Sequence, residues 1–111
     1  MAKLKAESSN ASYAQHLLNV VHGLAHLRTR HRADAVTIES GPTDDPVPHA
    51  RLKRVGVHLW TLDIADHRGK WGPVPVRATL EAVVGTLVGD FGWVLAPIDE
   101  DDPLRTSDQE H

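Results

Sequence analysis

The chain has 111 residues, no cysteine and a formal net charge of −3. This length fits one domain, and the missing cysteines exclude disulfides, thiolate metal sites and cysteine nucleophiles. The apolar stretches are too short for a membrane-spanning helix, and no apolar segment of a secretory signal follows the first lysines. We therefore expect a cytoplasmic protein that does not bind membranes.

The two ends differ in composition from the middle. We expect a flexible N-terminal tail over 1–11, a folded domain over 12–98 and a disordered acidic tail over 99–111, because both ends contain few apolar residues. The acidic tail holds six acidic residues and one arginine, whereas residues 1–98 hold eleven basic and nine acidic residues. Two roles fit such a tail: folding back on basic patches, or keeping the chain soluble.

The first elements are predicted from periodicity and turn residues. Ser12 is a suitable N-cap, and apolar residues then recur at helical spacing to about Arg30, which predicts a first helix that continues through Gly23. The β-branched stretch 35–39 predicts a short strand. The proline-rich stretch 40–49 predicts a long loop.

A β-hairpin is predicted next. Residues 55–64 have strong strand character, 66–69 form a turn, and 70–76 form the return strand. Pro73 and Pro75 cannot donate backbone hydrogen bonds to a neighbouring strand, so the return strand is expected to be either short or at an edge of the sheet.

Residues 77–91 predict a second helix whose two sides differ. The apolar side is expected to lie on the core and consists of Leu80, Val83, Val84, Leu87, Val88 and Phe91. The opposite side consists of the small residues Ala78, Ala82, Gly85 and Gly89. Since two glycines inside a helix destabilise it by about 1 kcal/mol each relative to alanine, we expect another backbone to approach this side. The first helix is the simplest candidate, and the same helix of a second copy is the other.

A last strand over 93–98 completes the prediction. The expected fold is a small α+β domain in the order α-β-β-β-α-β, with an antiparallel or mixed sheet of three to four strands, formed by the hairpin and the C-terminal strand and packed by two helices. We expect Trp60 and Trp93 in the core and Trp71 partly exposed.

Two histidines are weak candidates for metal ligands. His22 and His26 are four residues apart and share a helix face, as zinc ligands can. The glutamate of a His-Glu-x-x-His metallohydrolase is missing between them, and a solvated helix face explains both residues equally well. We therefore predict no metal and no cofactor.

Catalytic signatures are weak as well. One acidic and imidazole cluster close in sequence would suit acid/base or metal-dependent hydrolysis, and it consists of His58, Asp63, Asp66 and His67. The sequence has no phosphate-binding loop and no serine-nucleophile elbow. We predict that the chain is not an enzyme and assign no catalytic residue.

Basic residues gather in three stretches, 28–32, 51–54 and 68–71. They offer a candidate nucleic-acid surface composed of Arg28, Arg30, Arg32, Arg51, Lys53, Arg54, Arg68 and Lys70, with Trp71 as a stacking surface. The small excess of positive charge in residues 1–98 argues against a dedicated nucleic-acid binder.

The leading functional hypothesis from the sequence is a non-enzymatic protein-interaction module of adaptor, regulator or inhibitor type. It would bind a protein partner or itself, as a homo-oligomer and most simply a dimer, through the small side of the second helix. Two alternatives stay open: a nucleic-acid-associated protein that uses the three basic stretches, and a small hydrolase built on the cluster at 58–67.

Overall fold

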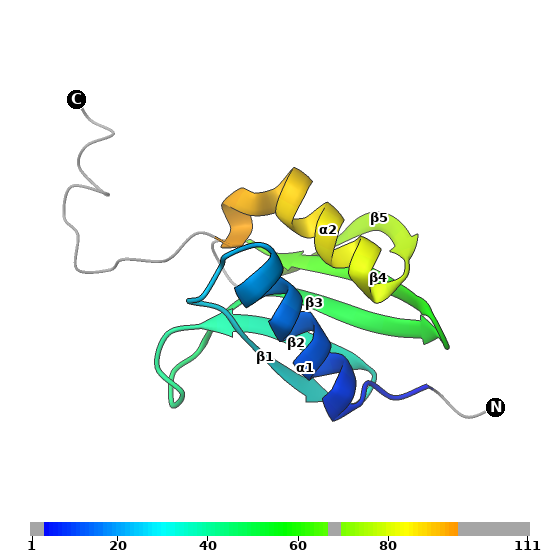
Figure 1. Ribbon diagram of the computed structural model, residues 1–111, viewed down its shortest axis with the longest axis horizontal. Helices are drawn as coiled ribbons and strands as arrows, with labels where there is room; N and C mark the ends of the chain where they lie inside the picture. Colours follow the sequence, from blue (N-terminus) through cyan, green and yellow to red (C-terminus); the bar gives the residue numbers. More distant parts are fainter. Residues whose placement is uncertain (1–3, 67–69, 96–111) are drawn as a thin grey trace.

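The computed structural model describes residues 4–66 and 70–95. The helices and strands (Figure 1) are α1 (Ser8–His16), β1 (Arg28–Arg32), β2 (Ala35–Ser40), β3 (Val47–Gly56), β4 (Leu59–Ala65), β5 (Trp71–Ala78) and α2 (Leu80–Phe91). A π-helical turn, η1 (Leu17–Val21), extends α1, and a 3-10 turn, η2 (Gly92–Leu95), follows α2.

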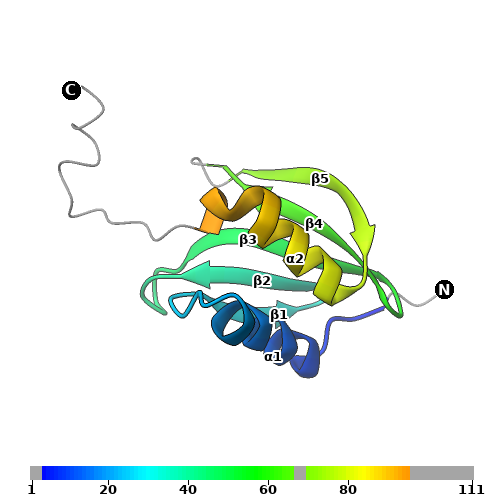
Figure 2. The ribbon, with the colours of Figure 1, turned by 45° about the horizontal axis from the view of Figure 1, so that its top comes forward.

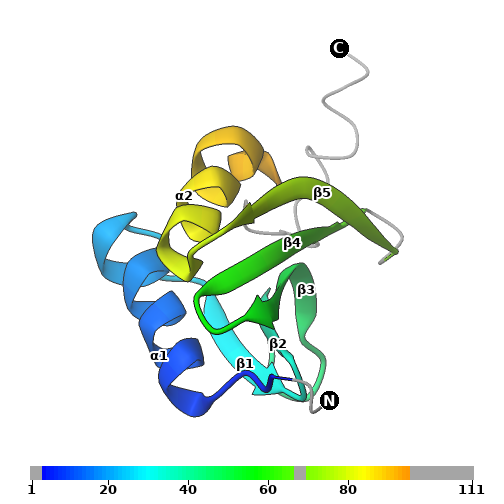
Figure 3. The ribbon, with the colours of Figure 1, turned by 90° about the vertical axis from the view of Figure 1, so that its right-hand side faces the viewer.

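The strands form one antiparallel sheet in the order β1-β2-β3-β4-β5. Both helices cover the same face, α1 beside β1 and α2 beside β4 and β5 (Figures 2 and 3). Within the described ranges the other face carries no helix. The predicted class of small α+β domain with two helices is confirmed, but the sheet has five strands and the order is α-β-β-β-β-β-α.

The first helix ends well before Arg30, which corrects the prediction. Gly23 has a φ of 72°, a left-handed conformation that glycine adopts without steric cost. The N–H of His22 donates to the carbonyl oxygen of Leu17 at 2.9 Å, and that of Leu24 to Leu18 at 2.7 Å, which caps the helix C-terminus. Because the chain reverses here, residues 28–32 form strand β1 instead of a last helical turn.

The middle of the chain contains more strand than predicted. β3 begins at Val47, so the connection after β2 is much shorter than the expected loop over 40–49. The predicted single strand over 55–64 is a hairpin that turns at Val57 and His58, with Gly56 opposite Leu59. The hairpin of β4 and β5 is confirmed, and the N–H of Asp66 donates to the carbonyl oxygen of Lys70 at 2.9 Å across its turn. Residues 67–69 of this turn lie outside the described ranges.

The second helix is confirmed from Leu80 onward. The hydroxyl of Thr79 caps it by accepting a hydrogen bond from the N–H of Ala82 at 3.2 Å. Residues 92–95 form η2, so the predicted strand over 93–98 is wrong in its described part. Trp93 is 70 % exposed, which contradicts its expected place in the core. The segment 96–111 lies outside the described ranges.

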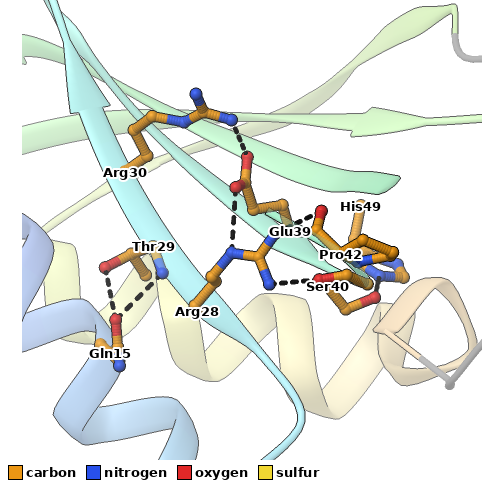
Figure 4. A network of polar contacts seen from close by, with 9 residues as sticks. Gln15, Arg28, Thr29, Arg30, Glu39, Ser40, Pro42 and His49 are labelled. Carbon is orange, nitrogen blue, oxygen red and sulfur yellow. Dashed lines mark hydrogen bonds and ion pairs between the residues drawn. The ribbon is translucent and has the colours of Figure 1, made fainter. Parts of the chain in front are cut away.

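The core lies between the sheet and the helices. The largest buried side chains come from both layers: Leu18, Leu27, Ile38, Leu52, Leu62 and Leu87, joined by Trp60 as predicted. Ala6 and Ala11, within the segment expected to be a flexible tail, are also buried. The backbone N–H and hydroxyl of Thr29 on β1 reach Gln15 of α1, which holds that helix on the sheet edge (Figure 4). No helix of the described ranges is long and apolar enough to cross a membrane.

Candidate functional site

The uncovered face of the sheet collects basic side chains from β1, β3 and β5. Directly paired residues on antiparallel strands point to the same side. One cross-strand row is Arg30, Thr37, Arg51, Asp63 and Pro73, and the next is Arg32, Ala35, Lys53, Thr61 and Arg77. These residues alternate along each strand with core residues, so both rows lie opposite the helices.

We name this surface the basic face. Its charged residues are Arg28, Arg30, Arg32, Glu39, Arg51, Lys53, Asp63 and Arg77. Of the nine basic residues in the described ranges, six lie on the basic face, whereas only two of the nine acidic residues do. Positive charge is therefore concentrated on the face that no described helix covers.

Two buried or half-buried carboxylates hold some of these arginines in place. Glu39 is 5 % exposed and accepts from Arg28 Nε at 3.2 Å and from Arg30 Nη2 at 2.6 Å (Figure 4). Asp63 accepts from Arg51 Nη2 at 2.9 Å, and the Arg51 guanidinium lies 4.4 Å from the centre of the Trp71 ring. Charge-assisted hydrogen bonds of this kind fix the direction of a guanidinium, so these arginines are positioned before any ligand arrives.

The neighbouring row carries positive charge without compensation. The side chains of Arg32, Lys53 and Arg77 have no hydrogen bond or ion pair with any residue of the described ranges. They lie on alternate strands, and with strands about 4.8 Å apart Lys53 is about 10 Å from each of the other two backbone positions, which are about 19 Å from one another. We name these residues the free row. An anion on this row would meet cations whose charge is not already neutralised.

The structure brings together only part of the predicted basic surface. The residues at 28–32 and Arg51 with Lys53 share the basic face, as their period-two spacing allowed. Arg54 lies on the opposite face of the sheet, with its guanidinium carbon 5.9 Å from the centre of the Trp60 ring. Lys70 lies in the hairpin turn, immediately before the first residue of β5. Arg68 lies outside the described ranges. Arg77 belongs to the basic face and was missed, because its segment was assigned to the second helix.

The cluster predicted for hydrolysis is not assembled. His58 lies in the turn before β4 and Asp66 follows its other end, roughly 25 Å away for an extended strand. Asp63 lies between them, paired with Arg51, and His67 is outside the described ranges. Among the described members, His58 therefore cannot act on the same substrate as Asp66.

His22 and His26, the weak candidates for metal ligands, lie after the last residue of η1, so they do not share a helix face. His26 Nε2 lies 2.6 Å from the carbonyl oxygen of Leu95 in η2. No group of three or more potential metal ligands forms within the part of the chain that the structure describes. A two-residue set alone would leave half of a four-coordinate zinc shell to water.

A buried serine and histidine form a polar cluster that the sequence did not reveal. Ser40 Oγ lies 2.7 Å from His49 Nε2, and His49 Nδ1 lies 2.8 Å from the carbonyl oxygen of Val94. Because a carbonyl oxygen only accepts, Nδ1 carries the proton and Nε2 accepts from the Ser40 hydroxyl. Burial lowers the pKa of His49 below its usual 6.5, against the opposing effect of the bond to Val94. The pair resembles a nucleophile and its base, but His49 is only 2 % exposed, so the cluster ties η2 to the sheet.

The small side of α2 is open. Apart from the adjacent backbone of α2 itself, a Cβ atom placed on Gly85 or Gly89 has no heavy atom of the described chain within 4 Å, and Ala82 is exposed. The first helix therefore does not approach these glycines, and the prediction that it covers them is wrong. Ala78 belongs to β5, opposite Trp60, and is not part of the helix surface.

Comparisons of this chain with protein-family models, with curated proteins and with solved structures find no match. The basic face is the more strongly charged of the two open surfaces.

Proposed function

We propose that this chain is a non-enzymatic nucleic-acid-binding module whose binding surface is the basic face. The observation that supports this is the free row, three cations in line across the sheet with no counter-ion among the described residues. A nucleic-acid backbone carries one negative charge per phosphate and binds where such cations replace its counter-ions. Other RNA-binding modules use the same layout, with helices behind an antiparallel sheet and the nucleic acid on its open face.

The arginines that form ion pairs contribute fixed side-chain orientation more than net positive charge. Glu39 and Asp63 neutralise part of the first row, so the net attraction comes mainly from Arg32, Lys53 and Arg77. Arg51 on Trp71 presents a flat surface near the same row, which suits stacking of a base. The salt dependence of the affinity should therefore correspond to about three phosphate contacts.

The test is the affinity for a short fluorescent single-stranded oligonucleotide, measured by anisotropy at several salt concentrations. Three phosphate contacts predict a slope of log affinity against log salt of about −2, a loss of roughly 20-fold between about 50 and 200 mM salt. Lys53→Gln should reduce the slope by about 0.7. A salt-independent affinity, or no binding at low salt, would reject the proposal.

A matched pair of added charges places the site. Thr37 lies between Arg30 and Arg51 on the basic face, whereas Ser12 is exposed on α1. Thr37→Lys should tighten binding, and Ser12→Lys should leave it unchanged at moderate salt because screening weakens distant charges. Equal effects of the two substitutions would show that only the net charge matters.

Self-association through α2 is a second candidate function, and it continues the interaction-module hypothesis. The open space at Gly85 and Gly89 supports it, since a second α2 could approach closely there. The exposed Val20 and Val21 lie on η1, which contacts α2, and would enlarge such an interface. The partner would then be a second copy of this chain.

Alanine substitutions separate an idle helix surface from an interface. If the surface is free in solution, Gly85→Ala with Gly89→Ala should stabilise the monomer by up to about 1 kcal/mol each. If two copies pack there, the same variant should weaken the dimer, seen as a lower mass by light scattering at equal concentration. A monomer at every concentration, together with the gain in stability, would exclude the interface.

A further inference from the structure

A groove lies on the basic face at the free row. Its volume is about 650 Å³, and its lining includes Lys53, Thr61, Asp63, Pro73, Pro75 and Arg77. Binding sites for small ligands have volumes of roughly 300 to 1,000 Å³. The groove therefore has the size of a site for one small group rather than for a protein surface.

The pairing of β4 with β5 is irregular at the groove. Thr61 pairs with Arg77 and Leu62 with Val74, so Pro75 and Val76 have no direct partner on β4. Extra residues on one strand bend it and interrupt its pairing, and such bulges are common beside binding sites. Because Pro73 and Pro75 lack an N–H group, this edge strand cannot pair fully with a sixth strand either.

Charge and apolar surface meet in the groove. Lys53 and Arg77 are the cross-strand neighbours of Thr61 on its two sides, and both belong to the free row. The rings of Pro73 and Pro75 are exposed and line the same groove. A ligand that fits must carry negative charge next to a compact apolar or flat part.

We propose that this groove receives one nucleotide of a bound single strand, with its base against the two prolines and its phosphates on Lys53 and Arg77. This rests on the proposed function and adds a preference to it. A base inside a duplex is stacked on both faces and paired along one edge, so it cannot enter the groove. A base in a single strand can leave its neighbours at a small cost in free energy. The basic face therefore selects single strands over duplexes.

The experiment compares strands that differ only in their bases. The probes are a labelled oligothymidylate of about 12 nucleotides, an abasic strand with the same number of phosphates, and a duplex of equal length. The wild-type protein should bind the oligothymidylate at least about fivefold more tightly than the abasic strand, the low end for one base held in a site. Thr61→Phe fills the groove between Lys53 and Arg77 without changing charge, and it should remove this preference. Thr61→Val keeps the shape of the side chain and should retain it.

Each outcome decides one point. Equal affinity of the wild-type protein for the abasic strand and the oligothymidylate overturns the groove proposal while leaving the basic face as a phosphate-binding surface. A preference that Thr61→Phe does not reduce, in a variant with an unchanged unfolding midpoint, overturns it too. Tighter binding of the duplex contradicts the inferred selection for single strands. Failure of every probe to bind at low salt overturns the proposed function itself.

Discussion

The two faces of the sheet differ in composition: one is apolar and buried, and the other is polar and charged. On the helix side, β3 and β4 present Leu52, Trp60 and Leu62 to a closed core, and each is at most 2 % exposed. On the other side, the alternating residues of the same strands are arginine, lysine, threonine and aspartate. Folding free energy therefore comes mainly from one face, while the other is free to be shaped by binding. The predictions below use neighbouring residues to test this separation.

The largest contrast in stability should come from two adjacent residues of β3. Leu52→Ala removes a fully buried side chain and should lower the free energy of unfolding by about 2–5 kcal/mol. Lys53→Ala, one position further on the opposite face, should change it by less than about 0.5 kcal/mol. Urea denaturation measures both. A large loss from Lys53→Ala would mean that the basic face also supports the fold.

A smaller change in stability is expected from substitution of Glu39, which is buried and also pairs with arginines of the basic face. Glu39→Gln removes the charge that Arg28 and Arg30 share, and should destabilise the protein by about 1–2 kcal/mol, reduced by the partial exposure of Arg30. The same substitution leaves two arginines without compensation, so nucleic-acid affinity at low salt should increase. Stability and affinity would then move in opposite directions. If both decrease, the pairing with Glu39 is needed to position the arginines for binding.

The smallest expected effect is the dependence of stability on pH, which arises from the buried His49 next to η2. Because the pKa of His49 is lowered in the folded protein, the unfolded chain takes up its proton first as the pH falls below 6.5. The stabilisation is complete above that pH and is lost below it, by at most about 1.4 kcal/mol per pH unit for one proton. Unfolding free energies measured from pH 7.5 to 5 should show this slope. His49→Gln should reduce it, and an unchanged slope would assign the titration to another group.

Part of the fold could be predicted because its signals are local. The apolar spacing over 80–91 and the strand character of 35–39 were sufficient to locate α2 and β2, and the strand character of 55–64 located most of β4. The first helix was extended too far because Leu24 and Leu27 continue its apolar spacing, although Gly23 adopts a conformation that ends it. The β-strand 93–98 was predicted from composition alone, and nothing in six residues distinguishes a strand from a short turn packed on the core.

The basic face was visible in the sequence only in fragments. Arg28, Arg30 and Arg32 recur every second residue, a period that places them on one side of a strand, but the helix prediction concealed it. That Lys53 and Arg77 join the same row depends on strand pairing, which is set by contacts between distant segments. His49 could not be foreseen for the same reason, since its partners Ser40 and Val94 come from different elements.

Among the described residues, positive charge is concentrated on one side of the sheet. The described residues carry equal numbers of basic and acidic side chains, yet six of the cations lie on one face and seven of the acids lie elsewhere. Such a molecule would turn its basic side toward any anionic polymer during the encounter, which raises the association rate more than the net charge suggests. At low salt near neutral pH it should also be retarded on both cation- and anion-exchange resins, a behaviour that its overall charge would not lead one to expect.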